Sequence, residues 1–312
     1  MSVALIHDPI CLKHQPGGGH PEQVARIERL MPAIERAPFA GDLLRIQPEA
    51  ADRRWLETVH DPDYLDFVDG AWAAGRRVLD GGDTRIAEQS AEAARVTAGA
   101  ALAAVDAVLA DGQRAAFSAM RPPGHHARPM TAMGFCLYGN IAIAARYAQQ
   151  HYKLKRVLIV DWDVHHGNGT QEMFYDDPSV GFLSIHQHPC YPGTGAATET
   201  GSGPGEGFTL NVPVSAGSDG AVYQRVFEQS LVTFAESIQP ELILISAGFD
   251  AHRDDPLAQV NLTEADFGSL TERVMALADR HCQGRIVSLL EGGYHLEAMP
   301  ASVVEHLRVL NG

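Results

Sequence analysis

Seven short apolar runs are spread along the chain, at residues 3–6, 115–119, 157–161, 180–186, 208–214, 242–246 and 286–290. They are apolar at nearly every position, which is typical of strands buried on both faces of a parallel sheet. Stretches with apolar residues at helical spacing lie between them, over residues 21–34, 91–109, 221–238 and 264–282. This alternation predicts an α/β fold with an open, mostly parallel sheet and helices on both faces.

Domain organisation follows from the same pattern. No internal repeat is visible, and no Pro-, Gly- or Ser-rich linker is long enough to separate two domains. Residues 193–207 are rich in Gly, Ser and Thr and predict one long surface loop. We therefore expect a single domain over residues 1–312.

Composition excludes several classes of protein. Lys and Arg number 24 against 39 Asp and Glu, a formal net charge of −15, which argues against a nucleic-acid-binding surface. The interpretation we favour is an acidic surface that aids solubility. The alternative is attraction of cationic substrates such as basic peptides or polyamines, which net charge alone supports only weakly. No segment reaches the roughly 18 apolar residues of a membrane span. The four cysteines have neither zinc-ribbon nor Cys-x-x-Cys spacing, which favours a reducing, cytoplasmic location.

A dense group of titratable residues, residues 161–170, follows the third apolar run. Asp163 and His165 are two positions apart, so in an extended segment they point to the same side and can share a metal. Asp161 alternates onto that side too. Asp250 follows another apolar run, and an Asp₂His set with an open position suits catalytic zinc. The alternative is that Asp250 caps a helix and Asp163 makes a loop hydrogen bond.

Two further loops carry candidate chemistry. Prolines make the loop at residues 121–126 rigid, and its adjacent His125 and His126 are candidates for proton transfer. The glycines before Tyr294 permit a tight turn that brings its hydroxyl towards a developing oxyanion. The alternatives are two hydrogen-bonded structural histidines and an ordinary turn with a packed tyrosine.

These motifs resemble the histone deacetylase family, with its arginase/deacetylase fold. The matching segments occur in the family's order, at residues 121–126, 134–135, 161–170, 191–195, 247–250 and 291–294. The resemblance implies eight strands in the sheet and a zinc-dependent amidohydrolase.

The resemblance also implies residue roles. The zinc ligands would be Asp163, His165 and Asp250. His126 would be the general base, with Asn168 as its partner; His125, oriented by Asp161, would be an electrostatic partner, and Tyr294 would polarise the amide carbonyl. Phe135 and Tyr191 would wall a narrow tunnel, and the other substrate contacts would be Gly134, Leu257, Asp83 and Thr84. A structural potassium ion would bind at Asp161, Asp163, His165, Ser184 and Ile185.

Three positions refine this reading. Asn168 stands where class I members carry Asp, so the chain resembles class II, and a neutral partner should leave His126 the less basic of the two histidines. Tyr294 is present, whereas some class II members have His there and act weakly on acetyl-lysine. Leu257 resembles the protein-deacetylase pattern, since the polyamine-selective vertebrate member carries Glu at this rim position.

We therefore expect an enzyme that removes acetyl or short acyl groups from the ε-amine of lysine in proteins or peptides. Acetylpolyamines or other small amides and esters are the alternative substrates, and a catalytically silent acyl-lysine binding module is a third reading. A manganese arginase would share a related fold, but the tandem histidines and the Gly-Gly-Tyr motif speak against it. The N/O ligand set does not by itself discriminate Zn²⁺ from Fe²⁺.

Overall fold

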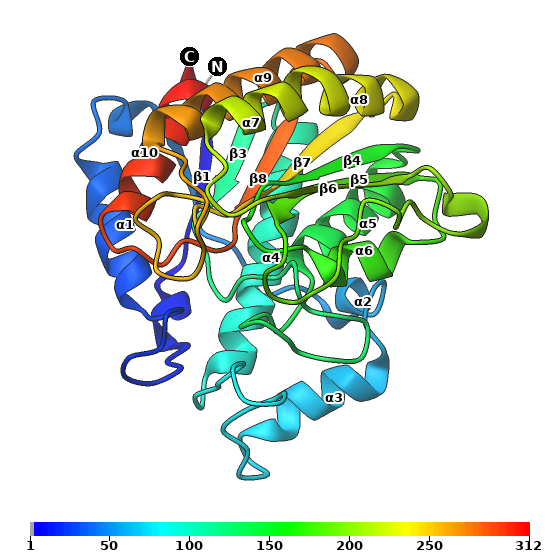
Figure 1. Ribbon diagram of the computed structural model, residues 1–312. Coiled ribbons are helices and arrows are strands. Elements are labelled where there is room, and N and C mark those ends of the chain that lie inside the picture. Colours follow the sequence, from blue (N-terminus) through cyan, green and yellow to red (C-terminus); the bar gives the residue numbers. More distant parts are fainter. Residues whose placement is uncertain (1–2) are drawn as a thin grey trace.

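The computed structural model describes residues 3–312, and in this part of the chain eight strands form one sheet (Figure 1). Every neighbouring pair is parallel, in the order β2-β1-β3-β8-β7-β4-β5-β6. The strands are β1 (Ala4–Ile6), β2 (Leu44–Ile46), β3 (Ala115–Ser118), β4 (Val157–Asp161), β5 (Val180–Gln187), β6 (Thr209–Val214), β7 (Leu242–Ala247) and β8 (Ile286–Leu290). The predicted fold class is confirmed.

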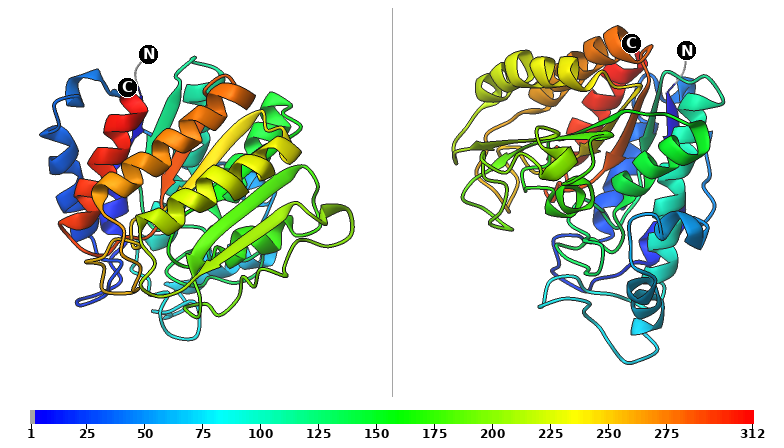
Figure 2. Two further views of the ribbon diagram at one scale, coloured as in Figure 1. Left: turned by 45° about the horizontal axis from the view of Figure 1, so that its top comes forward. Right: turned by 90° about the vertical axis from the view of Figure 1, so that its right-hand side faces the viewer.

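Helices cover both faces of the sheet (Figure 2). One face carries α4 (Ser90–Leu109), α5 (Asn140–Tyr152) and α6 (Asn168–Phe174), with α2 (Arg53–Leu56) and α3 (Pro62–Ala71) further out. The other carries α1 (Ala25–Glu35), α7 (Gly220–Arg225), α8 (Val232–Ile238), α9 (Glu264–His281) and α10 (Ala298–Asn311). This double cover buries every residue of β3, β4, β7 and β8, which explains their continuous apolar sequence.

Two predicted helices differ in detail. The helix expected over residues 221–238 is divided by a π-helical segment, Val226–Leu231. The helix expected from residue 21 begins at Ala25. Its first predicted residues form a turn instead, because Glu22 is drawn into a buried ion cluster and its N–H donates to His20.

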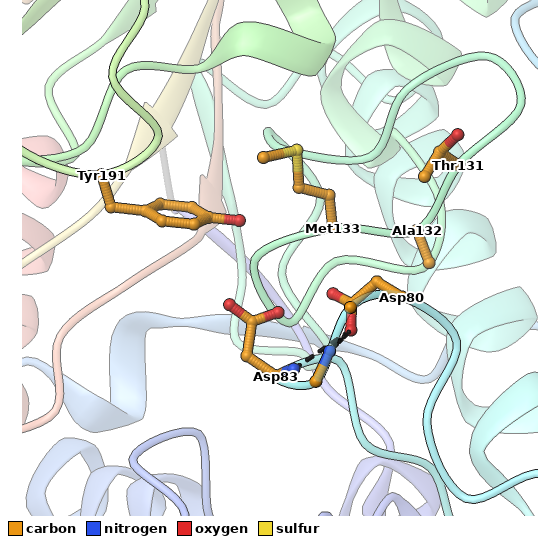
Figure 3. Close-up of a pocket in the computed structure, with 8 residues that line it drawn as sticks. Asp80, Asp83, Thr131, Ala132, Met133 and Tyr191 are labelled. Carbon is orange, nitrogen blue, oxygen red and sulfur yellow. Dashed lines mark hydrogen bonds between the residues drawn. The ribbon is translucent and has the colours of Figure 1, made fainter.

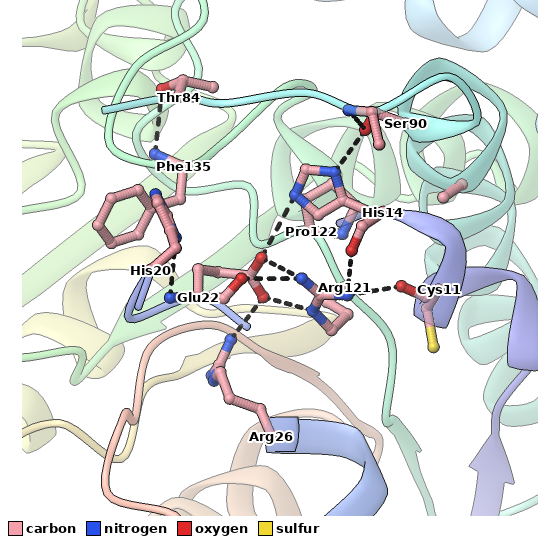
Figure 4. Close-up of polar contacts among 12 residues, drawn as sticks. Cys11, His14, His20, Glu22, Arg26, Thr84, Ser90, Arg121, Pro122 and Phe135 are labelled. Atoms are coloured by element: carbon pink, nitrogen blue, oxygen red, sulfur yellow. Dashed lines mark hydrogen bonds and ion pairs between the residues drawn. The ribbon is translucent and has the colours of Figure 1, made fainter. Parts of the chain in front are cut away.

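Glu22 is the centre of that cluster (Figure 4). Its carboxylate accepts two hydrogen bonds from Arg121, at 2.6 and 2.5 Å, and one from Arg26 at 3.1 Å. The His14 ring lies 3.3 Å from the same carboxylate. All four side chains are buried. Since Arg121 belongs to the loop after β3 and Arg26 to α1, Glu22 joins the N-terminal segment to the edge of the sheet where β3 ends.

Replacing Glu22 with Gln is expected to lower the free energy of unfolding by about 3–5 kcal/mol, because two buried guanidinium groups lose their counter-charge. Burial alone would raise the pKa of Glu22, but Arg121 and His14 hold it well below its usual range. The stabilisation is therefore present above the ordinary carboxylate pKa of about 4.3 and is lost as the pH falls below it. Urea unfolding at pH 7 measures the change.

The matched control is Glu35→Gln, which removes an exposed pair with Arg45 and should change the unfolding free energy by less than about 1 kcal/mol. Equal effects of the two substitutions would contradict the assigned role of Glu22.

Candidate active site

The candidate residues come from loops at one edge of the sheet. These loops follow β3, β4, β5, β7 and β8, and those five strands are consecutive in the sheet in the order β3-β8-β7-β4-β5. Because all strands are parallel, their carboxyl ends lie at the same edge, where open α/β sheets bind ligands. Loops separated by more than 160 residues of sequence, such as those carrying His125 and Tyr294, thus meet in one place.

Asp163, His165 and Asp250 are brought together at this edge. One potential ligand atom from each lies within 4.8 Å of the others, and all three residues are buried. His165 Nδ1 is 3.1 Å from Asp163 Oδ1 and 3.2 Å from Asp250 Oδ2. Within residues 3–312 no Lys or Arg forms an ion pair with either carboxylate. Two buried carboxylates and an imidazole nitrogen form a donor set that fits a divalent metal such as zinc.

Backbone groups orient the two carboxylates. Asp163 Oδ2 accepts the N–H of Gly292 at 2.8 Å, and Asp250 Oδ1 accepts the N–H of Val164 at 2.9 Å. A Cβ atom at Gly292 would lie 2.0 Å from Asp250 Oδ2, and one at Gly248 would lie 2.2 Å from Asp163 Oδ2. These two glycines are therefore required by the close approach of backbone to ligand carboxylates. Asp250 does not cap α9, whose N-cap is Thr263.

The tandem histidines have different partners. His125 Nδ1 is 3.0 Å from Asp161 Oδ2, and His126 Nδ1 is 2.8 Å from Asn168 Oδ1. Because the Asn168 carbonyl oxygen only accepts, His126 Nδ1 carries the proton, and Nε2 keeps a free lone pair. The predicted pairing of each histidine is present in the structure.

Electrostatics separates the two histidines further. Burial lowers the pKa of His125, but the carboxylates of Asp163 and Asp161 outweigh burial and raise it to about 10. Burial, together with the positive charge of the adjacent His125, brings the pKa of His126 well below its usual range. The surroundings therefore shift the two pKa values in opposite directions, and His126 is the histidine better suited to accept a proton.

A cavity of about 320 Å³ opens beside these groups. Predicted site residues that line it are His126, Gly134, Phe135, His165, Tyr191 and Tyr294, with Asp83 and Leu257 also in its wall. The Phe135 and Tyr294 rings lie 5.8 Å apart, and the His126 and Tyr191 rings 5.1 Å apart. A Cβ atom at Gly134 would lie 2.4 Å from the His126 ring, so this glycine lets the cavity wall approach the histidine.

Thr84 is the predicted contact residue that the structure does not place in this cavity. Its side chain is fully buried, and its hydroxyl accepts the N–H of Phe135 at 3.1 Å. Asp80 accepts the Thr84 N–H and hydroxyl and so holds Thr84 inside the loop. Thr84 therefore supports the wall from behind, and Asp83 alone of this pair reaches the cavity.

The proposed potassium ligands lie next to the metal triad. Asp161 and Ser184 are register partners on the adjacent strands β4 and β5, and Ile185 follows Ser184 on β5. All three residues are buried, and the Ser184 hydroxyl lies 2.9 Å from His186 Nδ1. Asp161, Ser184 and Ile185 therefore lie close together on two adjacent strands.

Three residues missed at the sequence level support the site. Glu291 is buried, and its Oε2 accepts the N–H groups of Gly124 and His125 at 2.6 and 3.2 Å. Asp255 accepts the N–H of Tyr294 at 2.7 Å. Cys190 lines the cavity beside Tyr191. Glu291 directly precedes the Gly-Gly-Tyr motif, and an acidic residue at the end of a buried strand was the available clue.

Arg26 holds the loop that carries Tyr294. Its guanidinium donates to the carbonyl oxygens of Gly293, at 2.7 Å, and Glu291, at 2.5 Å. The same group lies 5.0 Å from the centroid of the Tyr294 ring. The buried Glu22 cluster thereby extends to the tyrosine in the cavity.

Comparison with known proteins identifies the family. The family model of the histone deacetylase domain matches residues 20–310. The chain belongs to the histone deacetylase family. A protein of Arabidopsis thaliana named Histone deacetylase 14, chloroplastic, is 41% identical over 309 residues, covering 94% of this chain and 73% of that protein.

Other relatives extend the family match. The Histone deacetylase-like amidohydrolase of Pseudomonas aeruginosa is 38% identical over 327 residues, covering 98% of this chain and 86% of that protein. A crystal structure of the HD domain of HDA15 superposes with a TM-score of 0.94 at 38% identity, covering 100% of this chain and 88% of the other. These matches support a deacetylase activity, which is a hydrolase reaction, for this chain. Among residues 3–312, no helix has the length and apolar character needed to cross a membrane.

Proposed function

We propose that this chain is a zinc-dependent deacetylase that removes acetyl or short acyl groups from lysine side chains in proteins or peptides. The observation that carries the proposal is a single cavity. His126, Tyr294 and His165 line it, and His165 belongs to the buried Asp₂His triad, so three kinds of group that amide hydrolysis needs meet there. The family relationship supports the same chemistry.

The chain's own groups divide the work of hydrolysis. Bound zinc would supply Lewis-acid chemistry, polarising a carbonyl and lowering the pKa of water. His126 Nε2 would take a proton from the attacking water and return it to the nitrogen of the leaving amine, so that acetate and a free amine result. The Tyr294 hydroxyl would donate a hydrogen bond to the oxyanion. The ion pair of His125 with Asp161 would hold a positive charge next to the base.

The cavity walls favour an alkyl chain. Phe135 and Tyr191 present aromatic rings, and Leu257 adds an apolar side chain at the rim, which suits the methylene stem of lysine. Asp83 at the cavity wall would accept an amide N–H of the substrate. An acetylpolyamine is the second candidate substrate, because the Asp83 carboxyl group and the net charge of −15 also favour a cation.

Three further features complete the proposal. A structural potassium ion would bind through the main-chain oxygens of Asp161, Asp163 and His165, with Ser184 and Ile185, since oxygen ligands suit hard cations. Residues 1–312 would form one deacetylase domain. The cytoplasm is the proposed location, which the four free cysteines support.

A panel assay with zinc-loaded protein tests the function. Acetyl-lysine peptides, acetylputrescine, acetylspermidine and an acetate ester are compared by kcat/KM. We expect the peptides to be the best substrates. If kcat/KM for an acetylpolyamine were higher by orders of magnitude, the acetylpolyamine would replace acetyl-lysine as the assigned substrate. Zinc binding without turnover of any compound would indicate a binding module.

A further inference from the structure

A second cavity, of about 470 Å³, shares two wall residues with the active-site cavity. Figure 3 shows the residues that line it. Its wall includes Gly81, Gly82, Thr131, Ala132 and Met133. It also includes Asp83 and Tyr191, which line the active-site cavity too. The two cavities therefore lie side by side, with Asp83 and Tyr191 between them.

Two carboxylates line this second cavity. That of Asp83 points towards Tyr191 (Figure 3), and that of Asp80 is engaged elsewhere. Asp80 Oδ1 accepts the N–H groups of Gly82, Asp83 and Thr84 at 2.9, 3.1 and 3.0 Å. Asp80 is thus committed to holding its own loop and is a poor partner for an incoming cation. Opposite it, the wall is formed by carbon and sulfur of Met133, by Ala132 and by the Tyr191 ring (Figure 3).

Exposed apolar side chains gather around these two cavities. Among residues 3–312, four large hydrophobic residues are exposed: Leu44, Met130, Tyr191 and Leu257. Tyr191 and Leu257 line the active-site cavity, and Met130 directly precedes Thr131 of the second cavity. Only Leu44, on the edge strand β2, lies elsewhere. Clustered exposed apolar side chains on a strongly acidic protein indicate a binding surface.

We propose that the second cavity binds the apolar side chain of the residue next to the acetylated lysine in a polypeptide substrate. We name it the Met133 subsite, comprising Gly81, Gly82, Thr131, Ala132, Met133 and the Tyr191 ring. This inference rests on the proposed deacetylase function and narrows its substrate class. Neighbouring Cα atoms are about 3.8 Å apart. Adjacent side chains of a fully extended chain point to opposite faces, so the subsite serves a substrate whose backbone turns at the acetylated lysine. A lysine stem in the first cavity therefore leaves its neighbour beside Asp83 and Tyr191.

Met133 also connects the subsite to the catalytic base. Its sulfur accepts a hydrogen bond from Asn168 Nδ2 at 3.4 Å, and Asn168 Oδ1 is the partner of His126. A substrate side chain packed on Met133 restricts the motion of Asn168, the residue that orients His126. Substrates that fill the subsite should therefore show a higher kcat as well as a lower KM.

The test uses acetyl-lysine peptides in which the residue before or after the lysine is varied in turn. The measured quantity is the ratio of kcat/KM for a leucine neighbour to kcat/KM for a glycine neighbour. We expect a ratio of at least about tenfold on one side of the lysine in the wild type, from burial of one large apolar side chain. Gly81→Phe fills the subsite and should bring the ratio close to one.

Gly81 is a suitable position for this change, because a Cβ atom there meets nothing within 4 Å and its backbone lies outside the left-handed region. The matched control is Gly41→Phe, which has the same open surroundings, lies in the turn Ala40–Asp42 before β2 and lines neither cavity; its ratio should equal that of the wild type. Met133→Ser is a second variant and should lower the ratio by removing the apolar wall.

The outcomes separate the two proposals. Efficient turnover of all peptides with a wild-type ratio near one, or a ratio unchanged in Gly81→Phe, would overturn the Met133 subsite and leave the deacetylase function intact. A preference for lysine or arginine neighbours would overturn it in favour of an acidic rim. Failure of every acetyl-lysine peptide would instead reject the proposed function.

Discussion

Tyr294→Phe is expected to lower kcat for acetyl-lysine peptides about 10²–10³-fold, with little change in KM. The proposed role of the hydroxyl is to donate to the oxyanion, which forms only as the reaction proceeds, and losing one such donor typically has this effect. The ring itself stays in place, because Phe135 packs against it and Asp255 binds its backbone N–H at 2.7 Å. Steady-state kinetics of both proteins, each loaded with zinc, provides the measurement.

Tyr152→Phe is the matched control, since it removes a hydroxyl that donates to Asp106 at 2.6 Å on the surface of α5. Its kcat should match that of the wild type. If Tyr294→Phe retained most of its activity, the oxyanion role would be wrong. A loss confined to KM would mean that the hydroxyl binds the substrate before reaction.

The strands that carry the site could be predicted because each is buried on both faces and is apolar at most positions. This holds for β3, β4, β5, β7 and β8. β2 escaped prediction because it is a three-residue edge strand with Leu44 and Arg45 exposed, so its sequence lacks the apolar run. The loops that follow the buried strands could then be placed at one edge from the parallel order alone.

Long-range pairing explains what sequence reasoning missed. Glu22 is an acidic residue near a predicted helix start, where a solvent-facing carboxylate is the ordinary expectation. Its partner Arg121 lies 99 residues away, and no local pattern specifies that distance. The same applies to Arg26, which reaches Gly293 across 267 residues. Such partners become visible only when the fold has placed the two segments together.

The local motif was also incomplete for the histidines. Their pairing with Asp161 and Asn168 followed from the family resemblance, and the structure places the atoms at 3.0 and 2.8 Å. Glu291 adds a buried carboxylate beneath the backbone of His125, a contact that its position at the end of a buried strand did not specify. Burial raises the pKa of Glu291, so the backbone N–H groups and Ser246 that it binds are needed to stabilise its ionised form.

Asp163→Asn is expected to abolish stoichiometric zinc binding. The substitution keeps the size of the side chain and removes one of the two negative charges in the triad, and Asp163 offers a ligand atom within 4.8 Å of those of His165 and Asp250. We expect about one equivalent of zinc in the wild type and less than about a tenth of that in the variant, by elemental analysis after gel filtration. Deacetylation should fall to background together with the metal.

Thermal unfolding supplies a readout that does not depend on activity. Metal that binds the folded state a thousandfold above its Kd stabilises it by about 4 kcal/mol, so zinc should raise the Tm of the wild type by several degrees. That rise should vanish in Asp163→Asn and persist in the control Asp254→Asn, whose exposed carboxylate lies outside the triad. A variant that still bound one zinc, with an unchanged rise in Tm, would show that Asp163 is a structural hydrogen-bond acceptor and not a ligand.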